Sequence, residues 1–226
     1  MIKDLKINKK EVLRYLCCNG EFKDEKLEAL INSTIDEVKK IIKPKYIYDS
    51  FKIENTKEGV KFLGTNLRLE GEDIKKHLSL SKTCVLMAAT LGHDLDRKIS
   101  LYEKTNMTKA IIMEACGTAA IEELCDNIEG YVKKEGEKKN LNITYRYSPG
   151  YGDLDLKVQR EFLNIIQWVK NIGITLSYNN IMAPRKSVTA IIGFVPINSR
   201  LEKKNCIQCN KYNECIYRKL GGTCEN

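Results

Sequence analysis

The segment SVTAIIGFV, residues 187–195, carries apolar side chains on both faces of the strand that it is predicted to form. A strand with one face in water alternates apolar and polar residues, whereas a strand covered on both faces does not. The segment is therefore predicted to be a central strand of a sheet. Pro184 stands just before it and cannot donate a ladder hydrogen bond, so the backbone must bulge or lie at an edge there.

Helices and further strands are predicted on the N-terminal side of this segment. The clearest helix covers 24–42, where apolar residues recur at helical spacing, Asp24 can act as N-cap and Pro44 ends the element. The other predicted helices cover 11–18, 72–79, 94–103, 107–134 and 156–170. Further strands are predicted within 45–70, 83–92, 141–146 and 173–182, where β-branched and aromatic residues are frequent.

Composition limits the classes of protein to consider. Of 226 residues, 42% are hydrophobic and 30% are charged, so a packed core is expected rather than wholesale disorder. No stretch approaches about twenty apolar residues and no apolar run follows the first lysines, so a cytoplasmic protein without membrane span or signal peptide is expected. The net charge of +8 permits contact with nucleic acid or an acidic protein, but surplus lysines on a solvated surface explain it more simply.

The motif RYSPGY (146–151) combines residue types that suit a ligand. Arg146 is expected at the end of a strand, on the polar face that also carries Thr144, where its guanidinium can pair with a carboxylate or a phosphate. The proline presets a turn, Gly150 allows close approach of a ligand, and Tyr151 offers a ring for stacking. The alternative is a Pro-Gly turn with a surface salt bridge, which the motif alone does not exclude.

RYSPGY and the later segment GITLSYNNIMAPRKSVTAIIG (173–193) together resemble the activation domain of cobalamin-dependent methionine synthase, the module that binds S-adenosylmethionine. The pair is fairly specific, whereas either segment alone would be weak. A looser likeness extends to TLGHDLD (90–96) and EACGTAAIEEL (114–124), and to the helices near the N-terminus, so that the resemblance covers roughly residues 10–196.

The resemblance implies an α+β fold: a single domain with a long, bent antiparallel sheet flanked by helices. It also implies a set of residues that bind S-adenosylmethionine, which here are Arg146, Tyr147, Gly150, Tyr151, Glu122 and Ser187. In that family the arginine clamps the methionine carboxylate, the residues after it surround the nucleoside, and the glutamate faces the site from the long helix.

The chemistry that the resemblance implies is methyl transfer from S-adenosylmethionine to the cobalt of cobalamin, after reduction of the cobalt by one electron. Positioning dominates such a transfer, so no catalytic acid, base or nucleophile is expected. A chain of 226 residues has no room for a corrinoid module, so the cobalamin is expected on a separate partner, such as a methionine synthase that lacks its own activation domain. A low-potential electron donor, a flavodoxin or a ferredoxin, is expected upstream.

The main domain is predicted to cover 1–198, with a helical N-terminal region at 10–43, and a cysteine-rich appendage to cover 199–226. The appendage holds four cysteines at the spacing C-x2-C-x5-C-x8-C, which are Cys206, Cys209, Cys215 and Cys224. Four thiolates can hold zinc as a structural site, or an iron–sulfur cluster that could deliver the electron, and the spacing does not decide between them. The other five cysteines, including adjacent Cys17 and Cys18, are expected to pack in apolar surroundings.

Two other classes of function stay open. A zinc-containing, basic nucleic-acid-binding protein agrees with the net charge and the cysteines, although basic and aromatic residues form no interleaved patch, so nucleic acid is not the expected partner. Steeply salt-dependent binding to random oligonucleotides would favour this class. The second class is a module that recognises a corrinoid protein without catalysis, and it agrees with the same motifs as the methyl-transfer hypothesis.

Overall fold

The computed structural model describes residues 5–18, 24–166, 169–199 and 212–213. The helices are α1 (Lys9–Tyr15), α2 (Glu25–Ile41), α3 (Glu72–His77), α4 (His93–Thr105), α5 (Met107–Glu137), α6 (Val158–Ile165) and the 3-10 helix η1 (Val169–Ile172). The strands are β1 (Lys45–Thr56), β2 (Gly59–Phe62), β3 (Arg68–Leu69), β4 (Thr83–Thr90), β5 (Leu141–Ile143), β6 (Thr175–Leu176), β7 (Met182–Ala183) and β8 (Ser187–Pro196).

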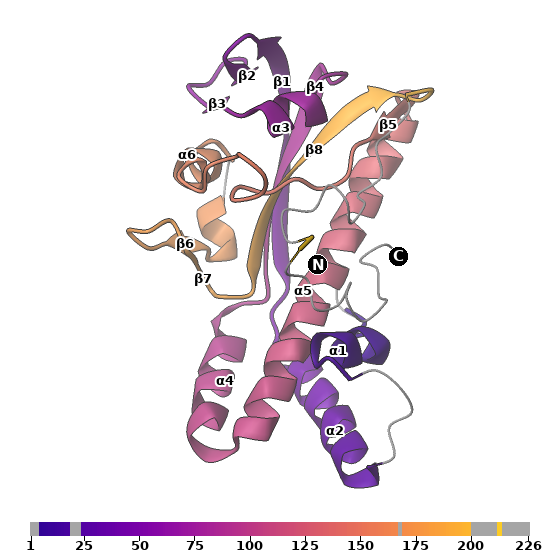
Figure 1. The fold of residues 1–226 in the computed structure, drawn as a ribbon, viewed down its shortest axis with the longest axis vertical. Coiled ribbons are helices and arrows are strands. Elements are labelled where there is room, and N and C mark those ends of the chain that lie inside the picture. Colours follow the sequence, from indigo (N-terminus) through magenta and orange to yellow (C-terminus); the bar gives the residue numbers. More distant parts are fainter. Residues whose placement is uncertain (1–4, 19–23, 167–168, 200–211, 214–226) are drawn as a thin grey trace. The chain divides into compact units, whose positions relative to one another are not determined.

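Six strands form one sheet in the order β3-β2-β1-β4-β8-β5, and β6 and β7 form a separate pair (Figure 1). The pairs β1·β2, β2·β3 and β5·β8 are antiparallel. Strand β8 lies between two other strands, and its residues from Thr189 to Val195 are all buried. The prediction of a central strand is therefore confirmed, and so is the α+β class with an antiparallel sheet.

The chain divides into two compact units, each made of three segments. Unit 1 comprises Met1–Tyr48, Met87–Gly130 and Ile166–Thr189, and unit 2 comprises Asp49–Leu86, Tyr131–Ile165 and Ala190–Asn226. The long strands β1, β4 and β8 contribute residues to both units. No helix in the described part of the chain is long and apolar enough to cross a membrane.

Helix α2 of unit 1 forms as its sequence predicts. The Asp24 carboxylate accepts hydrogen bonds from the backbone N–H groups of Lys26 and Leu27, which supplies partners to the first turn. The apolar stripe is buried, with Ile31 and Val38 at 1% and 0% exposure. Burial of this stripe, rather than helix propensity, is expected to supply most of the stability of the helix.

The structure differs from the sequence-based prediction in several places. The strand predicted within 173–182 is reduced to β6, which pairs with β7 in the separate two-stranded sheet. The helix predicted over 156–170 is shorter, because regular α-helix ends at Ile165 and the 3-10 helix η1 follows. The strand predicted over 141–146 ends at Ile143. Cys17 is exposed rather than packed, since it lies just past α1 with a φ of 55°. Three other cysteines, Cys84, Cys116 and Cys125, are buried as predicted.

Gly193 of β8 lies unusually close to Ser81 in unit 2. A Cβ at Gly193 would overlap Ser81 Oγ and would lie 2.8 Å from Leu78 Cδ2. The Ser81 hydroxyl is itself buried and has no hydrogen-bond partner among the described residues. The absence of a side chain at Gly193 is therefore what lets the segment after α3 approach the central strand.

We expect Gly193→Ala to lower the free energy of unfolding by about 1–3 kcal/mol, the usual cost of overpacking. Ser81→Ala removes both the overlap and a buried hydroxyl that lacks a partner, so by itself it should be neutral or slightly stabilising. In the Ser81→Ala background the cost of Gly193→Ala should fall by at least about 0.5 kcal/mol, because the two side chains are in contact. Urea unfolding of the four proteins measures this, and strictly additive effects would contradict it.

Candidate functional site

Arg146 lies in a β-bulge between β5 and β8. Leu141 to Ile143 pair with Pro196 to Phe194 in regular register, and the Thr144 amide continues it by donating to the Gly193 carbonyl at 2.9 Å. Tyr147, however, pairs with Ile191 through two hydrogen bonds of 3.0 and 2.8 Å. Two residues, Tyr145 and Arg146, therefore lie opposite the single residue Ile192, which is the definition of a bulge.

The surroundings of Thr144 and the pairing around Arg146 differ from the predicted alternation of an apolar and a polar face. Thr144 was expected on a polar face, but it is buried at 6% exposure. Its hydroxyl accepts a hydrogen bond from the Gly193 amide at 2.8 Å, which gives the central strand a partner where regular pairing stops. Arg146 is half-buried. Because one extra residue changes which side chains point to which face, bulges can redirect a side chain beside a functional site.

The residues after Arg146 form a tight turn with one exposed ring. Gly150 has a φ of +89°, and the space around its missing side chain is open apart from Leu156 Cδ1 at 3.6 Å. Its amide donates to the Leu154 carbonyl at 2.8 Å, which closes the turn. Tyr151 follows with 50% of its surface exposed, so its ring is accessible for stacking.

The buried side chain of Tyr147 holds this turn through a hydrogen bond. Its side chain is only 6% exposed, and its hydroxyl donates to the Tyr151 carbonyl at 3.1 Å. Burial raises the pKa of the Tyr147 hydroxyl well above its usual range, and the carboxylates of Asp73 and Asp153 raise it further. The group therefore stays protonated and remains a donor. The role of Tyr147 beside a nucleoside stays a prediction, and its buried ring and hydroxyl hold Tyr151 in place.

Asp153 joins the end of this turn to α3. Its Oδ2 accepts from the Glu72 amide at 2.6 Å, and its Oδ1 lies 3.3 Å from the Asp73 amide. Helix α3 starts after Gly71, which has no side chain to cap these amides. Asp153 thus acts as the N-cap from a distant part of the sequence.

We expect Asp153→Ala to lower the free energy of unfolding by about 1 kcal/mol, the typical cost of losing an N-cap. Asp153→Asn keeps an acceptor oxygen and should recover most of this loss. Hydrogen exchange at the Glu72 and Asp73 amides reports the cap directly and should accelerate in the alanine variant only. Equal exchange in all three proteins would show that Asp153 does not cap α3.

The segment around Ser187 is held within unit 1 by α4 and α5. The Arg185 amide donates to Asp96 Oδ2 at 2.8 Å, and Lys186 Nζ donates to Glu114 Oε1 and to Thr118 Oγ1, each at 2.8 Å. The Lys186 side chain is only 12% exposed, so it is not one of the surplus solvated lysines. The peptide bond between Ala183 and Pro184 is cis.

Ser187 and Glu122, the two predicted ligand-binding residues of unit 1, have different surroundings. The Ser187 hydroxyl donates to the Pro184 carbonyl at 2.7 Å and lies 2.8 Å from Thr90 Oγ1. Glu122 is half-buried on α5. Burial raises the pKa of the Tyr15 hydroxyl on α1, and the negative charge of Glu122 raises this pKa further. A role in ligand binding stays a prediction for both residues.

Sequence reasoning missed the part that α3 plays in this site. His77 Nε2 lies 3.0 Å from Thr144 Oγ1, although 67 residues separate the two in the chain, and the Asp153–Glu72 contact spans 81 residues. No local pattern could have revealed these contacts, because they depend on how α3 packs beside the turn.

The predicted metal site cannot be placed in this structure, because Cys206, Cys209, Cys215 and Cys224 lie outside the described residues. Within the described ranges, no group of three or more histidine, cysteine or acidic side chains could hold a metal ion. Zinc or an iron–sulfur cluster on the four cysteines therefore stays a prediction from their spacing.

Comparison with known proteins identifies the fold. A crystal structure of the MetH reactivation domain bound to AdoHcy is similar to this chain with a TM-score of 0.63 and 15% sequence identity, covering 93% of this chain and 80% of that one. No protein-family model matches the chain, and no curated protein matches it. At this level of identity the similarity is one of fold.

Proposed function

We propose that this protein binds S-adenosylmethionine at the turn that follows Arg146 and supports reductive methylation of the cobalt of a corrinoid carried by a separate protein, such as a methionine synthase. The observation that carries the proposal is the bulge at Tyr145 and Arg146, which sets the arginine apart from the regular sheet just before Gly150 and the exposed Tyr151. The similar fold of a domain solved with AdoHcy, the demethylated form of this ligand, supports it.

The residues of the turn suit the parts of S-adenosylmethionine. The planar guanidinium of Arg146 can bind the ligand carboxylate through two parallel hydrogen bonds. The exposed ring of Tyr151 can stack on adenine, as aromatic side chains do with bases. Because Gly150 leaves open space where a side chain would stand, the ligand can approach the backbone there.

The proposed reaction asks the protein to position its ligand rather than to move protons. One electron from a low-potential donor, for which a flavodoxin or a ferredoxin is the expected class, reduces the cobalt of the partner. The reduced cobalt then forms a bond to the methyl carbon, the S–CH3 bond breaks, and S-adenosylhomocysteine leaves with the electron pair of that bond. In this scheme the methyl group must face outward, toward the partner.

The proposal is tested in two steps. Calorimetry with S-adenosylmethionine and with S-adenosylhomocysteine should show saturable binding of one molecule per chain, and absence of binding of both would overturn the proposal. Transfer is then followed with S-adenosylmethionine labelled in its methyl group, a cobalamin-loaded methionine synthase that lacks an activation domain, and a low-potential chemical reductant. Label on the cobalamin only in the presence of this protein supports the full function, whereas binding without transfer would reduce it to a binding module.

A further inference from the structure

His77, the last residue of α3, contacts the chain on both sides of Arg146. Its ring centroid lies 4.5 Å from that of Tyr145 and 5.0 Å from that of Tyr147, in tilted arrangements. Such distances are typical of favourable aromatic contacts. Tyr145 and Tyr147 are the immediate neighbours of Arg146, so the His77 ring contacts the residue on each side of this arginine.

His77 also makes a polar contact at the start of the bulge. Its Nε2 lies 3.0 Å from Thr144 Oγ1, which accepts from the Gly193 amide and lies 3.2 Å from the Tyr145 carbonyl oxygen. A hydroxyl has a single hydrogen, and the carbonyl can only accept. All three contacts are satisfied when the Thr144 hydroxyl donates to that carbonyl and His77 Nε2–H donates to the hydroxyl. In this pattern the His77 imidazole is the hydrogen-bond donor.

Helix α3 is held at its other end as well. Asp153 caps its first amides, as described above, and Gly152 fits closely against Asp73 of the same helix. A short helix is thereby attached to the chain before Arg146 through His77 and to the chain after Tyr151 through Asp153. Fixed at both ends, it limits how far the segment between these contacts can move.

We propose that His77 is a positioning residue, which sets the direction of the Arg146 guanidinium by holding the bulge on both sides. This inference rests on the proposed function, because the arginine needs a ligand carboxylate to act on. His77 itself does not touch the ligand in this scheme. Its substitution should therefore weaken the recognition of the carboxylate more than the recognition of the nucleoside.

Three substitutions separate the two contacts of the imidazole. His77→Gln keeps a nitrogen donor at a similar reach but removes the ring, His77→Phe keeps a ring but removes the donor, and His77→Ala removes both. The ligands are S-adenosylhomocysteine and methylthioadenosine, which shares the nucleoside and the thioether but lacks the amino-acid carboxylate. Thermal melts of the free proteins verify that each variant is folded.

We expect His77→Ala to weaken binding of S-adenosylhomocysteine by about tenfold, within the coupling range of residues in contact, and to leave the affinity for methylthioadenosine within about twofold. His77→Gln and His77→Phe should each recover part of the loss. Equal losses for both ligands, no loss for either, or unfolding of all three variants would make His77 a structural residue only and overturn the inference. If the wild-type protein binds neither ligand, the proposed function fails first, and the positioning role fails with it.

Discussion

Arg146→Ala is expected to weaken binding of S-adenosylmethionine by about a hundredfold, because it removes a bidentate, charge-assisted interaction with the ligand carboxylate. Arg146→Lys keeps the charge but cannot form the two parallel hydrogen bonds, so its affinity should lie between those of the wild type and the alanine variant. Calorimetry at constant salt measures all three, since charge interactions weaken as ionic strength rises.

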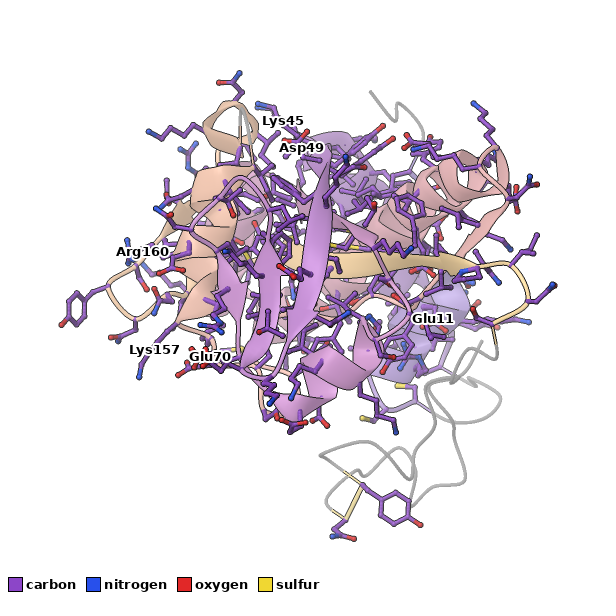
Figure 2. All side chains as sticks on the ribbon, turned by 90° about the horizontal axis from the view of Figure 1, so that it is seen from above. Glu11, Lys45, Asp49, Glu70, Lys157 and Arg160 are labelled. Atoms are coloured by element: carbon purple, nitrogen blue, oxygen red, sulfur yellow. The ribbon has the colours of Figure 1, made fainter. Side chains whose placement is uncertain are left out.

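Arg160→Ala is the matched control for this prediction. Arg160 is exposed on α6, in the same unit as Arg146 and outside the turn (Figure 2). Arg160→Ala removes the same charge as Arg146→Ala, so its effect on affinity should stay within about twofold if only long-range attraction is lost. If both alanine variants bind equally well, or if Arg146→Ala binds like the wild type, the carboxylate clamp is wrong.

Gly152→Ala is expected to damage both the turn and the fold. Gly152 has a φ of +52°, and an added Cβ would overlap Asp73 Oδ2 and lie 2.5 Å from the Tyr147 hydroxyl. The left-handed backbone costs about 1–2 kcal/mol for a residue with a Cβ, and the overpacking adds about 1–3 kcal/mol. We therefore expect the free energy of unfolding to fall by about 2–4 kcal/mol, together with loss of ligand binding.

Gly150→Ala separates the cost of the left-handed backbone from the cost of overpacking. Gly150 also has a positive φ, of +89°, but its missing side chain faces open space, so only the backbone cost applies. Its loss of stability should be about 1–2 kcal/mol, and smaller than that of Gly152→Ala in the same urea titration. If the two substitutions cost the same, the close packing of the turn against Asp73 and Tyr147 contributes nothing to stability.

The site could be predicted from the sequence only as far as local chemistry allows. RYSPGY contains a charge, a turn and an accessible ring in consecutive residues, and the structure places Gly150 and Tyr151 in that turn with the tyrosine ring exposed. The polar surroundings expected for Thr144 were wrong, because this side chain is buried. The alternation predicted to reach Arg146 is interrupted after Thr144, because alternation assumes that every residue has one partner across the sheet. Only the pairing with β8, in which Tyr145 and Arg146 both lie opposite Ile192, reveals the extra residue.

What the sequence by itself determined is therefore the set of elements whose signals are local. Asp24 caps α2, the apolar stripe of that helix is buried, and the strand that is apolar on both faces is central in the sheet. Only the tertiary structure decided the bulge at Arg146 and its attachment to α3. These features arise from contacts between residues far apart in the chain, and the periodicity of one segment carries no information about the partner it will meet.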